Sequence, residues 1–312
     1  MSTPSSNNKT IIGSADNFWL FDEKLGFDIT HPSNPDSPLI YPRLTLQTSK
    51  TPVTLAPHKT AIVVIGMQNF FLSSAMGREI GSGHAAEQAI LEKCIPAARK
   101  ANIRILWLTW GISNEGLRTV PPMFYRNFGL TFIPESNVPA NATNKSKQQW
   151  QPTVGGIGQS VGNVTLEDGT SIDGGRTLMK DQWNTELHGG LANAYNEGSK
   201  LSPADIRFHK ETHSGFWGDN TDFARYIKRE GLKPLLFAGV NTDQCVLATM
   251  QDAAQQGYDT IMLKDACSTV SPQFAQDAVE FNAHKAFGFQ SSCDDLLYGA
   301  EHVEISAAKL EL

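Results

Sequence analysis

The chain has 312 residues, of which 40% are hydrophobic, and its formal net charge at pH 7 is -6. That length allows one large domain or two small ones, with room for a sizeable core. The acidic balance and the scattered lysines and arginines provide no basic footprint for nucleic acid.

Cysteine usage and the N-terminal segment indicate the cellular compartment. The four cysteines form no CxxC pair and have no disulfide-like spacing, which favours a reducing compartment; they are Cys94, Cys245, Cys267 and Cys293. The first residues, MSTPSSNNKT, lack the apolar region of a Sec signal peptide. No apolar run approaches the roughly 20 residues of a membrane-spanning helix. We therefore expect a cytoplasmic protein without membrane or nucleic-acid partners.

From residue 60 onward, apolar β-branched runs alternate with segments of helical spacing. The predicted strands are residues 60–66, 103–110, 204–210, 233–239 and 259–266, with a sixth at 302–306. The predicted helices lie near residues 84–101, 219–230, 242–256 and 272–287. This alternation predicts a three-layer α/β/α fold with a mostly parallel, Rossmann-like sheet. In such sheets, ligands bind beyond the carboxyl ends of the strands.

Two regions fall outside the alternation. Residues 1–57 hold an aromatic cluster and proline-rich connections, and we expect an arm that docks on the main domain, residues 58–312, or on a neighbouring subunit. Residues 131–176 form a polar insert with a predicted hairpin at 163–173, whose turn is Asp168-Gly169. A loop of that length in a compact domain is either a functional lid or a disordered insert.

Cys245 stands between a predicted buried strand and a predicted helix. Thr242 is a good N-cap, which makes Cys245 the third helical residue, close to unpaired backbone N–H groups. The positive end of the helix dipole favours thiolate over thiol. The alternative is a cysteine packed as a small hydrophobic residue.

The ends of three predicted strands carry Gly66, Lys210 and the segment leading to Cys245. If these strands are neighbours, all three positions face one crevice. A lysine there stabilises a thiolate and holds an anionic group. The alternative for Lys210 is an ordinary surface lysine at a strand end.

At these motifs the chain resembles the isochorismatase-like cysteine hydrolases, a family that includes isochorismatases, nicotinamidases and N-carbamoylsarcosine and ureidoacrylate amidohydrolases. The resemblance covers about residues 58–300 and is strongest in AIVVIGMQNFF, HKETHSGFWG and GVNTDQCVLATMQDAAQQGYDTIMLKDA. It implies Cys245 as the nucleophile and Lys210 as the lysine of an Asp–Lys–Cys triad. It also implies a cis peptide at Val240–Asn241, with the Asn241 and Cys245 backbone N–H groups forming an oxyanion hole.

The chain departs from the family at Gly66, where the resemblance implies the catalytic aspartate. Glycine accepts no proton, and a general base contributes typically about 10²–10⁴-fold to a rate. Three interpretations stay open: a substitution that traps substrate, a natural pseudoenzyme, or cysteine chemistry with Lys210 as the only partner. If an acid once stood there, we expect a carboxylate-sized gap beside Cys245 and Lys210.

The resemblance also bears on metals. Nicotinamidases carry an Asp-x-His pair after the second strand that helps to bind zinc or iron, whereas this chain reads LTWGISNEG there. His209 and His213 flank Lys210 and are interpreted as polar packing residues rather than ligands. We expect a site without metal or other cofactor.

Residues just past strand ends are candidates for binding a small-molecule substrate. Gln68 and Asn69 offer hydrogen bonds, and the aromatic candidates for the pocket wall are Phe70, Phe71, Trp110, Phe216 and Trp217. Core packing is the alternative for each aromatic residue. Cys94, Cys267 and Cys293 are interpreted as structural.

The expected function is hydrolysis of an amide or ureido C–N bond in a small carbonyl substrate by Cys245 and Lys210, in a homo-oligomer. Activity is expected to be impaired, trapped or altered by Gly66. An isochorismate-type vinyl ether hydrolase and a catalytically dead ligand-binding protein are the alternatives.

The missing Asp-x-His pair predicts that any hydrolytic activity survives chelators. Turnover should be unchanged after dialysis against EDTA. Loss of turnover in EDTA, with recovery on added zinc, would contradict a metal-free site.

Overall fold

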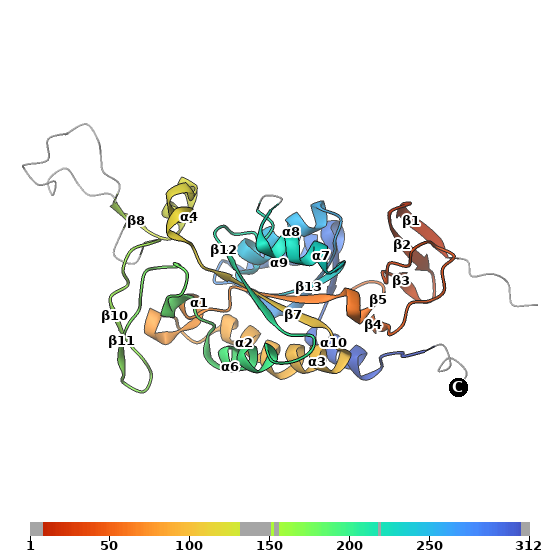
Figure 1. The fold of residues 1–312 in the computed structure, drawn as a ribbon, viewed down its shortest axis with the longest axis horizontal. Helices are drawn as coiled ribbons and strands as arrows, with labels where there is room; N and C mark the ends of the chain where they lie inside the picture. Colours follow the sequence, from red (N-terminus) through yellow and green to blue (C-terminus); the bar gives the residue numbers. More distant parts are fainter. Residues whose placement is uncertain (1–8, 132–150, 153–155, 218–219, 307–312) are drawn as a thin grey trace, which may run out of the picture.

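The computed structural model describes residues 9–131, 151–152, 156–217 and 220–306. Its centre is a six-stranded sheet in the order β12-β7-β6-β13-β14-β15, and every pairing is parallel (Figure 1). The strands are β6 (Ala61–Ile65), β7 (Arg104–Trp110), β12 (Ile206–Lys210), β13 (Pro234–Val240), β14 (Asp259–Ser268) and β15 (Gly288–Ser291).

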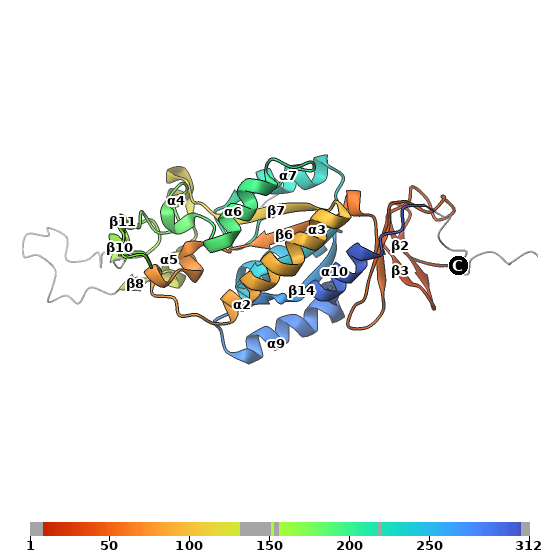
Figure 2. The same ribbon diagram turned by 90° about the horizontal axis from the view of Figure 1, so that it is seen from below.

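Helices cover both faces of this sheet, which confirms the predicted three-layer fold (Figures 1 and 2). One face carries α2 (Ser82–Ala89), α3 (Ile95–Ala101), α6 (Gly189–Gly198) and α10 (Cys293–Glu301). The other carries α7 (Asp222–Arg229), α8 (Leu247–Gln255) and α9 (Gln273–Asn282). Three π-helical turns adjoin these helices: η3 (Ile90–Cys94), η6 (Thr242–Val246) and η7 (Ala283–Phe287).

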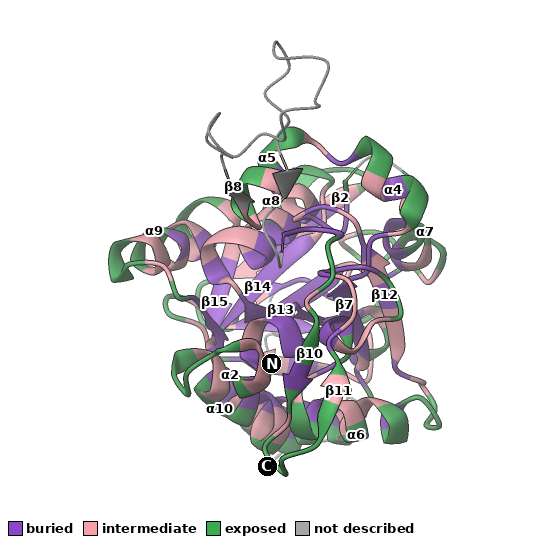
Figure 3. Ribbon diagram, turned by 90° about the vertical axis from the view of Figure 1, so that its left-hand side faces the viewer, coloured by how far each residue is buried: buried purple, intermediate pink, exposed green. Residues whose placement is uncertain are grey.

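The two innermost strands, β6 and β13, are apolar at every position because both of their faces are covered. In β6, Ile62 and Val64 pack toward α3 and α10, whereas Val63 and Ile65 pack toward α7 and α8. The strands form the buried centre in Figure 3, with the exposed surface on the surrounding helices and loops. The sheet is therefore a rigid platform whose strand ends can hold a site.

The sixth strand lies elsewhere than predicted. It is β15, and residues 302–306 contribute only the bridge between Arg43 and Glu304. β15 has only four residues and directly follows η7, with Gly288 as the C-cap of the helix and the first residue of the strand. The apolar alternation at 302–306 misled the prediction, since Ile305 is exposed.

The N-terminal arm folds as a second sheet, in the order β1-β2-β3-β5-β4. Its strands are β1 (Thr10–Ser14), β2 (Asn17–Asp22), β3 (Gly26–Asp28), β4 (Leu44–Leu46) and β5 (Val53–Leu55). Leu44 and Val53 join the core beneath α3 and α10, and the Trp19 indole donates to Asp259 at 2.7 Å. This sheet lies at the end of the molecule opposite the carboxyl ends of the central strands (Figure 1).

Those carboxyl ends are covered by short elements, seen at the left of Figure 1. They are α1 (Asn69–Leu72), η2 (Ser74–Met76), α4 (Asn114–Thr119), α5 (Pro122–Asn127), η5 (Trp183–Thr185) and the pair β8 (Leu130–Thr131) and β9 (Gln151–Pro152). The predicted hairpin is confirmed as β10 (Asn163–Thr165) and β11 (Ser171–Asp173), whose connection contains Asp168 and Gly169. Residues 132–150 and 153–155 of the insert lie outside the described residues.

No helix in the described part of the chain is long and apolar enough to cross a membrane.

Candidate active site

Lys210 and Cys245 meet beyond the carboxyl ends of the parallel strands. Lys210 is the last residue of β12, and its Nζ lies 3.3 Å from Sγ of Cys245. The strands behind them are not consecutive: β6 and β13 are neighbours, but β7 separates β12 from β6. The Lys210 side chain nevertheless reaches Cys245 Sγ, and both residues are buried, with 4% and 3% exposure.

The Lys210 ammonium has three partners, one for each of its N–H groups. It donates to the Thr212 carbonyl oxygen at 2.8 Å and to Cys245 Sγ, and it lies 3.8 Å from the centroid of the Trp110 ring. Burial lowers the pKa of Lys210 to about 8, and the interaction with Cys245 partly opposes that shift. Near neutral pH this amine can therefore both accept and release a proton.

The helix that carries Cys245 begins one residue earlier than predicted. Its N-cap is Asn241 rather than Thr242, and its first turn is the π-helical η6, so Cys245 is the fourth helical residue. The Thr242 hydroxyl does not cap the helix; it is buried and has no partner among the described residues. The Val240–Asn241 peptide is cis, as the family resemblance implied.

Gly66 occupies no gap of the kind expected for a missing carboxylate. Its φ is +69°, a conformation that favours glycine, and a Cβ built there would lie 2.3 Å from the Val240 carbonyl oxygen. The end of β6 thus packs directly against the segment that leads to Cys245. In this backbone position 66 accommodates no side chain.

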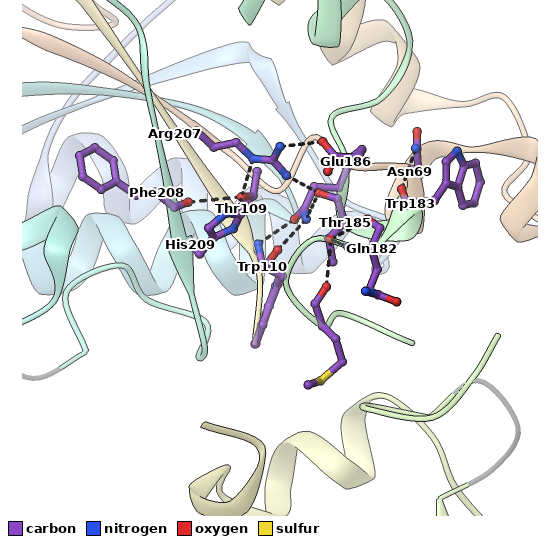
Figure 4. A network of polar contacts seen from close by, with 12 residues as sticks. Asn69, Thr109, Trp110, Gln182, Trp183, Thr185, Glu186, Arg207, Phe208 and His209 are labelled. Carbon is purple, nitrogen blue, oxygen red and sulfur yellow. Dashed lines mark hydrogen bonds and ion pairs between the residues drawn. The ribbon is translucent and has the colours of Figure 1, made fainter. Parts of the chain in front are cut away.

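Gln68 and Asn69 form hydrogen bonds with backbone groups of the protein. Gln68 is fully buried; its amide donates to the carbonyl oxygens of Trp110 and Thr185 and accepts from the Trp110 N–H. Asn69 donates to the carbonyl oxygen of Trp183. In Figure 4 these contacts tie the end of β7 to η5, in a network that includes the side chains of Thr109 and Arg207. Gln68 therefore holds Trp110 in place, and Asn69 binds the backbone of η5.

Trp110 belongs to an aromatic cluster that lies beside the Lys210 ammonium. Phe124 and Phe128 approach the Trp110 ring edge-on at centroid distances of 5.6 and 5.3 Å, and His213 does so at 5.8 Å. Phe70 joins through Phe128 at 6.1 Å. We call Phe70, Trp110, Phe124, Phe128 and His213 the aromatic cluster.

The other aromatic candidates lie differently. Phe71 stacks edge-on against Phe70 at 5.0 Å and is half-buried. Phe216 packs against Phe223 and Tyr258 in the core beneath α7. Trp217 is 64% exposed. Phe216 thus has the core-packing role that was its alternative, and Trp217 contacts none of the aromatic cluster in the described structure.

Sequence reasoning missed Phe124 and Phe128. Both lie in or just after α5, a six-residue helix that begins at Pro122. The PP dipeptide before them was the only turn signal in that segment, and nothing in the local pattern showed that α5 would fold back over Trp110.

The histidines beside Lys210 have protein contacts of their own. Nδ1 of His209 lies 3.2 Å from the Thr109 hydroxyl, and burial lowers the pKa of both His209 and His213 to about 4. Among the described residues, no group of three or more histidine, cysteine or acidic side chains is placed to hold a metal ion.

The remaining cysteines are buried in the core. Burial raises the pKa of Cys267, and the contact with Cys94 together with burial raises the pKa of Cys293. Neither lies beside a lysine comparable to Lys210.

Fold and site together define an α/β protein with a buried Lys–Cys pair at the carboxyl end of a parallel sheet. The sequence profile of the Isochorismatase domain matches residues 169–294, a segment that contains Lys210 and Cys245 and begins after Gly66. This segment of the chain is therefore similar to isochorismatase domains.

The relatives cover most of the chain. The chain is 26% identical over 257 residues to the ureidoacrylate amidohydrolase RutB of Agrobacterium fabrum, covering 81% of this chain and 94% of that protein. The RutB of Pseudomonas savastanoi pv. phaseolicola is 28% identical over 265 residues, with 83% and 91% covered. Among solved structures, a cysteine hydrolase from Pseudomonas syringae pv. phaseolicola matches with a TM-score of 0.55 and 18% identity, covering 86% of this chain and 99% of that one.

The geometry predicts that Cys245 reacts fastest with iodoacetamide, because only its sulfur lies beside a buried ammonium. Mass mapping after a time course at neutral pH measures the four rates. Lys210→Met should slow labelling at Cys245 and leave the other three rates unchanged. Faster labelling of Cys94, Cys267 or Cys293 would assign the reactive thiol elsewhere.

The packing at Gly66 predicts that any side chain there destabilises the fold. Gly77 is a matched control, since its φ is +71° and no atom lies within 4 Å of an added Cβ. Gly77→Ala should cost only the backbone term, on the order of 1 kcal/mol, whereas Gly66→Ala and Gly66→Asp should cost about 1–3 kcal/mol more. Denaturant unfolding measures the difference. A Gly66→Asp protein of unchanged stability whose turnover rises about 10²-fold would instead support a disabled Asp–Lys–Cys site.

Proposed function

We propose that the protein hydrolyses an amide or ureido C–N bond of a small carbonyl substrate, with Cys245 as nucleophile and Lys210 as the proton carrier. The observation that carries the proposal is the 3.3 Å contact between Nζ and Sγ in a buried site. The named activity of the RutB relatives, ureidoacrylate amidohydrolase, supports the same bond type.

Proton transfer between the two side chains prepares the attack. The neutral Lys210 amine takes the proton of the Cys245 thiol, and the thiolate adds to the substrate carbonyl carbon. The carbonyl π-electrons move to oxygen, where the Asn241 and Cys245 backbone N–H groups stabilise the charge. When the C–N bond breaks, the Lys210 ammonium returns its proton to the leaving nitrogen, and a thioester with Cys245 remains.

Lys210 then repeats the exchange with water. The neutral amine accepts a proton as water adds to the thioester, and collapse of the adduct breaks the C–S bond and frees the Cys245 sulfur. The lowered pKa of Lys210 suits both steps, since a group with pKa near the working pH gives and takes protons with little loss. Because position 66 has no side chain, the lysine performs the exchange that the family aspartate would perform.

A second candidate function rests on Gly66. Without the carboxylate, the site could bind its ligand and not turn it over, as a binding protein does. An isochorismate-type vinyl ether cleavage is the other alternative, but no contact of the described residues favours it over C–N hydrolysis.

The pKa of Lys210 predicts the pH profile. An unperturbed lysine loses its proton near pH 10.5, whereas this one does so near pH 8. Below about pH 8 the neutral amine that accepts the Cys245 proton is depleted, so kcat should fall through an acid limb near that pH. Assaying uncharged amides and simple ureides by amine or ammonia release from pH 6 to 10 tests this.

Substitutions distinguish a lysine that transfers protons from one that acts only through its positive charge. Lys210→Arg keeps the charge at every pH but exchanges no proton, so kcat should drop by about 10²–10⁴-fold. Lys228→Arg, at the exposed end of α7, is the matched control and should leave the profile unchanged. Equal activity in Lys210→Arg would show that the lysine acts only through its charge. Binding without turnover in the unmodified protein would favour the binding-protein alternative.

A further inference from the structure

Two ring nitrogens in the aromatic cluster are buried without a hydrogen-bond partner. They are Trp110 Nε1 and His213 Nε2, and no acceptor or donor reaches either one in the described structure. The two rings adjoin each other at 5.8 Å, and both contact Phe124. Two adjoining rings, each with an unpaired nitrogen, thus lie next to Lys210.

Most polar groups near these nitrogens are paired, and the Thr242 hydroxyl is an exception. Gln68 pairs its amide with Trp110 and Thr185, and the Trp107 indole, on the same strand, donates to Asp205 at 3.0 Å. Buried polar groups are nearly always paired, and each exception requires an explanation. In the described structure these two unpaired nitrogens lie beside the candidate active site, whereas the Trp107 indole, earlier in β7, is paired.

The position of the Trp110 ring connects these nitrogens to the chemistry. Its π-face receives the Lys210 ammonium at 3.8 Å, so the same ring contacts the reacting pair and carries the unpaired N–H. Its backbone is clamped by Gln68 and its edge by Phe124 and Phe128. The indole N–H therefore points in a direction that the scaffold sets.

We infer that Trp110 Nε1 and His213 Nε2 form a subsite that binds a second polar group of the substrate, and that this group is uncharged. The inference rests on the proposed function only in taking the ligand to be the substrate of Cys245. The indole N–H is a donor only, so it requires an acceptor such as a carbonyl oxygen. The imidazole Nε2 donates or accepts according to its tautomer, and an amide or ureide group satisfies either.

Charge balance favours the uncharged class. His213 is neutral near pH 7 because burial and the Lys210 charge lower its pKa to about 4. The three N–H groups of Lys210 already have partners. A carboxylate at this subsite would be buried against two neutral rings, and the nearby Lys210 ammonium has no N–H group left to pair with it, which makes its burial unfavourable. The favoured substrates are flat amides or ureides with a second, uncharged acceptor.

The test measures binding in full-length Cys245→Ser protein, where turnover cannot interfere. Calorimetry or ligand-observed NMR compares three flat probes: fumaramide, which has two amides; crotonamide, which has one; and the fumaramate anion, whose second group is a carboxylate. Fumaramide should bind at least about tenfold more tightly than either of the others. Trp110→Phe or His213→Phe should remove that advantage while leaving crotonamide affinity unchanged.

Stability distinguishes recognition from a structural role. Trp110→Phe removes an unpaired donor, so it should destabilise the ligand-free protein only through the cavity left in place of the larger indole. Trp107→Phe is the matched control: it leaves Asp205 short of a donor, so it should destabilise the fold and leave probe binding unchanged.

Three results would overturn the inference. Equal binding of fumaramide and crotonamide would mean that the nitrogens hold water only. Tighter binding of fumaramate would assign an anionic substrate. Destabilisation by Trp110→Phe equal to that by Trp107→Phe would make the indole N–H structural. Since no turnover is measured, failure of the proposed hydrolysis leaves this test intact.

Discussion

A lysine ammonium buried at the end of a parallel sheet is the constraint on which the site depends. A buried cation is tolerated only where hydrogen bonds and an opposite charge replace water. Here the replacements come from separate parts of the chain: the Thr212 carbonyl after β12, the Trp110 ring at the end of β7, and Cys245 in η6. Each must be placed to within a few tenths of an ångström, so the strand ends must be rigid.

The segment after β6 supplies that rigidity through its backbone and one amide. Gln68 pairs with both backbone groups of Trp110 and so continues the sheet by one residue with a side chain. Gly66 brings the end of β6 against the Val240 carbonyl, beside the start of η6. The motif that resembles a catalytic segment is thus used here for packing. The end of β6 can approach the Val240 carbonyl this closely only because residue 66 has no side chain.

The sequence predicts well which residues lie at the ends of the parallel strands. It predicts poorly which residues fold back over those strand ends. Lys210 and Cys245 could be paired in advance because parallel strands end at one edge. The fully apolar runs likewise predicted the sheet. The role of Gln68 could not be predicted, because the sequence does not show whether a polar residue after a strand faces a ligand or the backbone. The contacts of Phe124 and Phe128 with Trp110 could not be predicted, because they depend on the direction of the short helix α5, which no local sequence pattern determines.

Chemistry and recognition occupy different parts of this site. Proton exchange involves Lys210 and Cys245, which follow β12 and β13, whereas the unpaired nitrogens belong to Trp110 and His213. Trp110 touches both, since its π-face contacts the ammonium and its edge carries the free N–H. An acceptor bound at that edge polarises the indole N–H and raises the electron density of the ring, which strengthens its attraction for the Lys210 ammonium. Binding should therefore favour the charged form of Lys210, which is the form that protonates the leaving nitrogen.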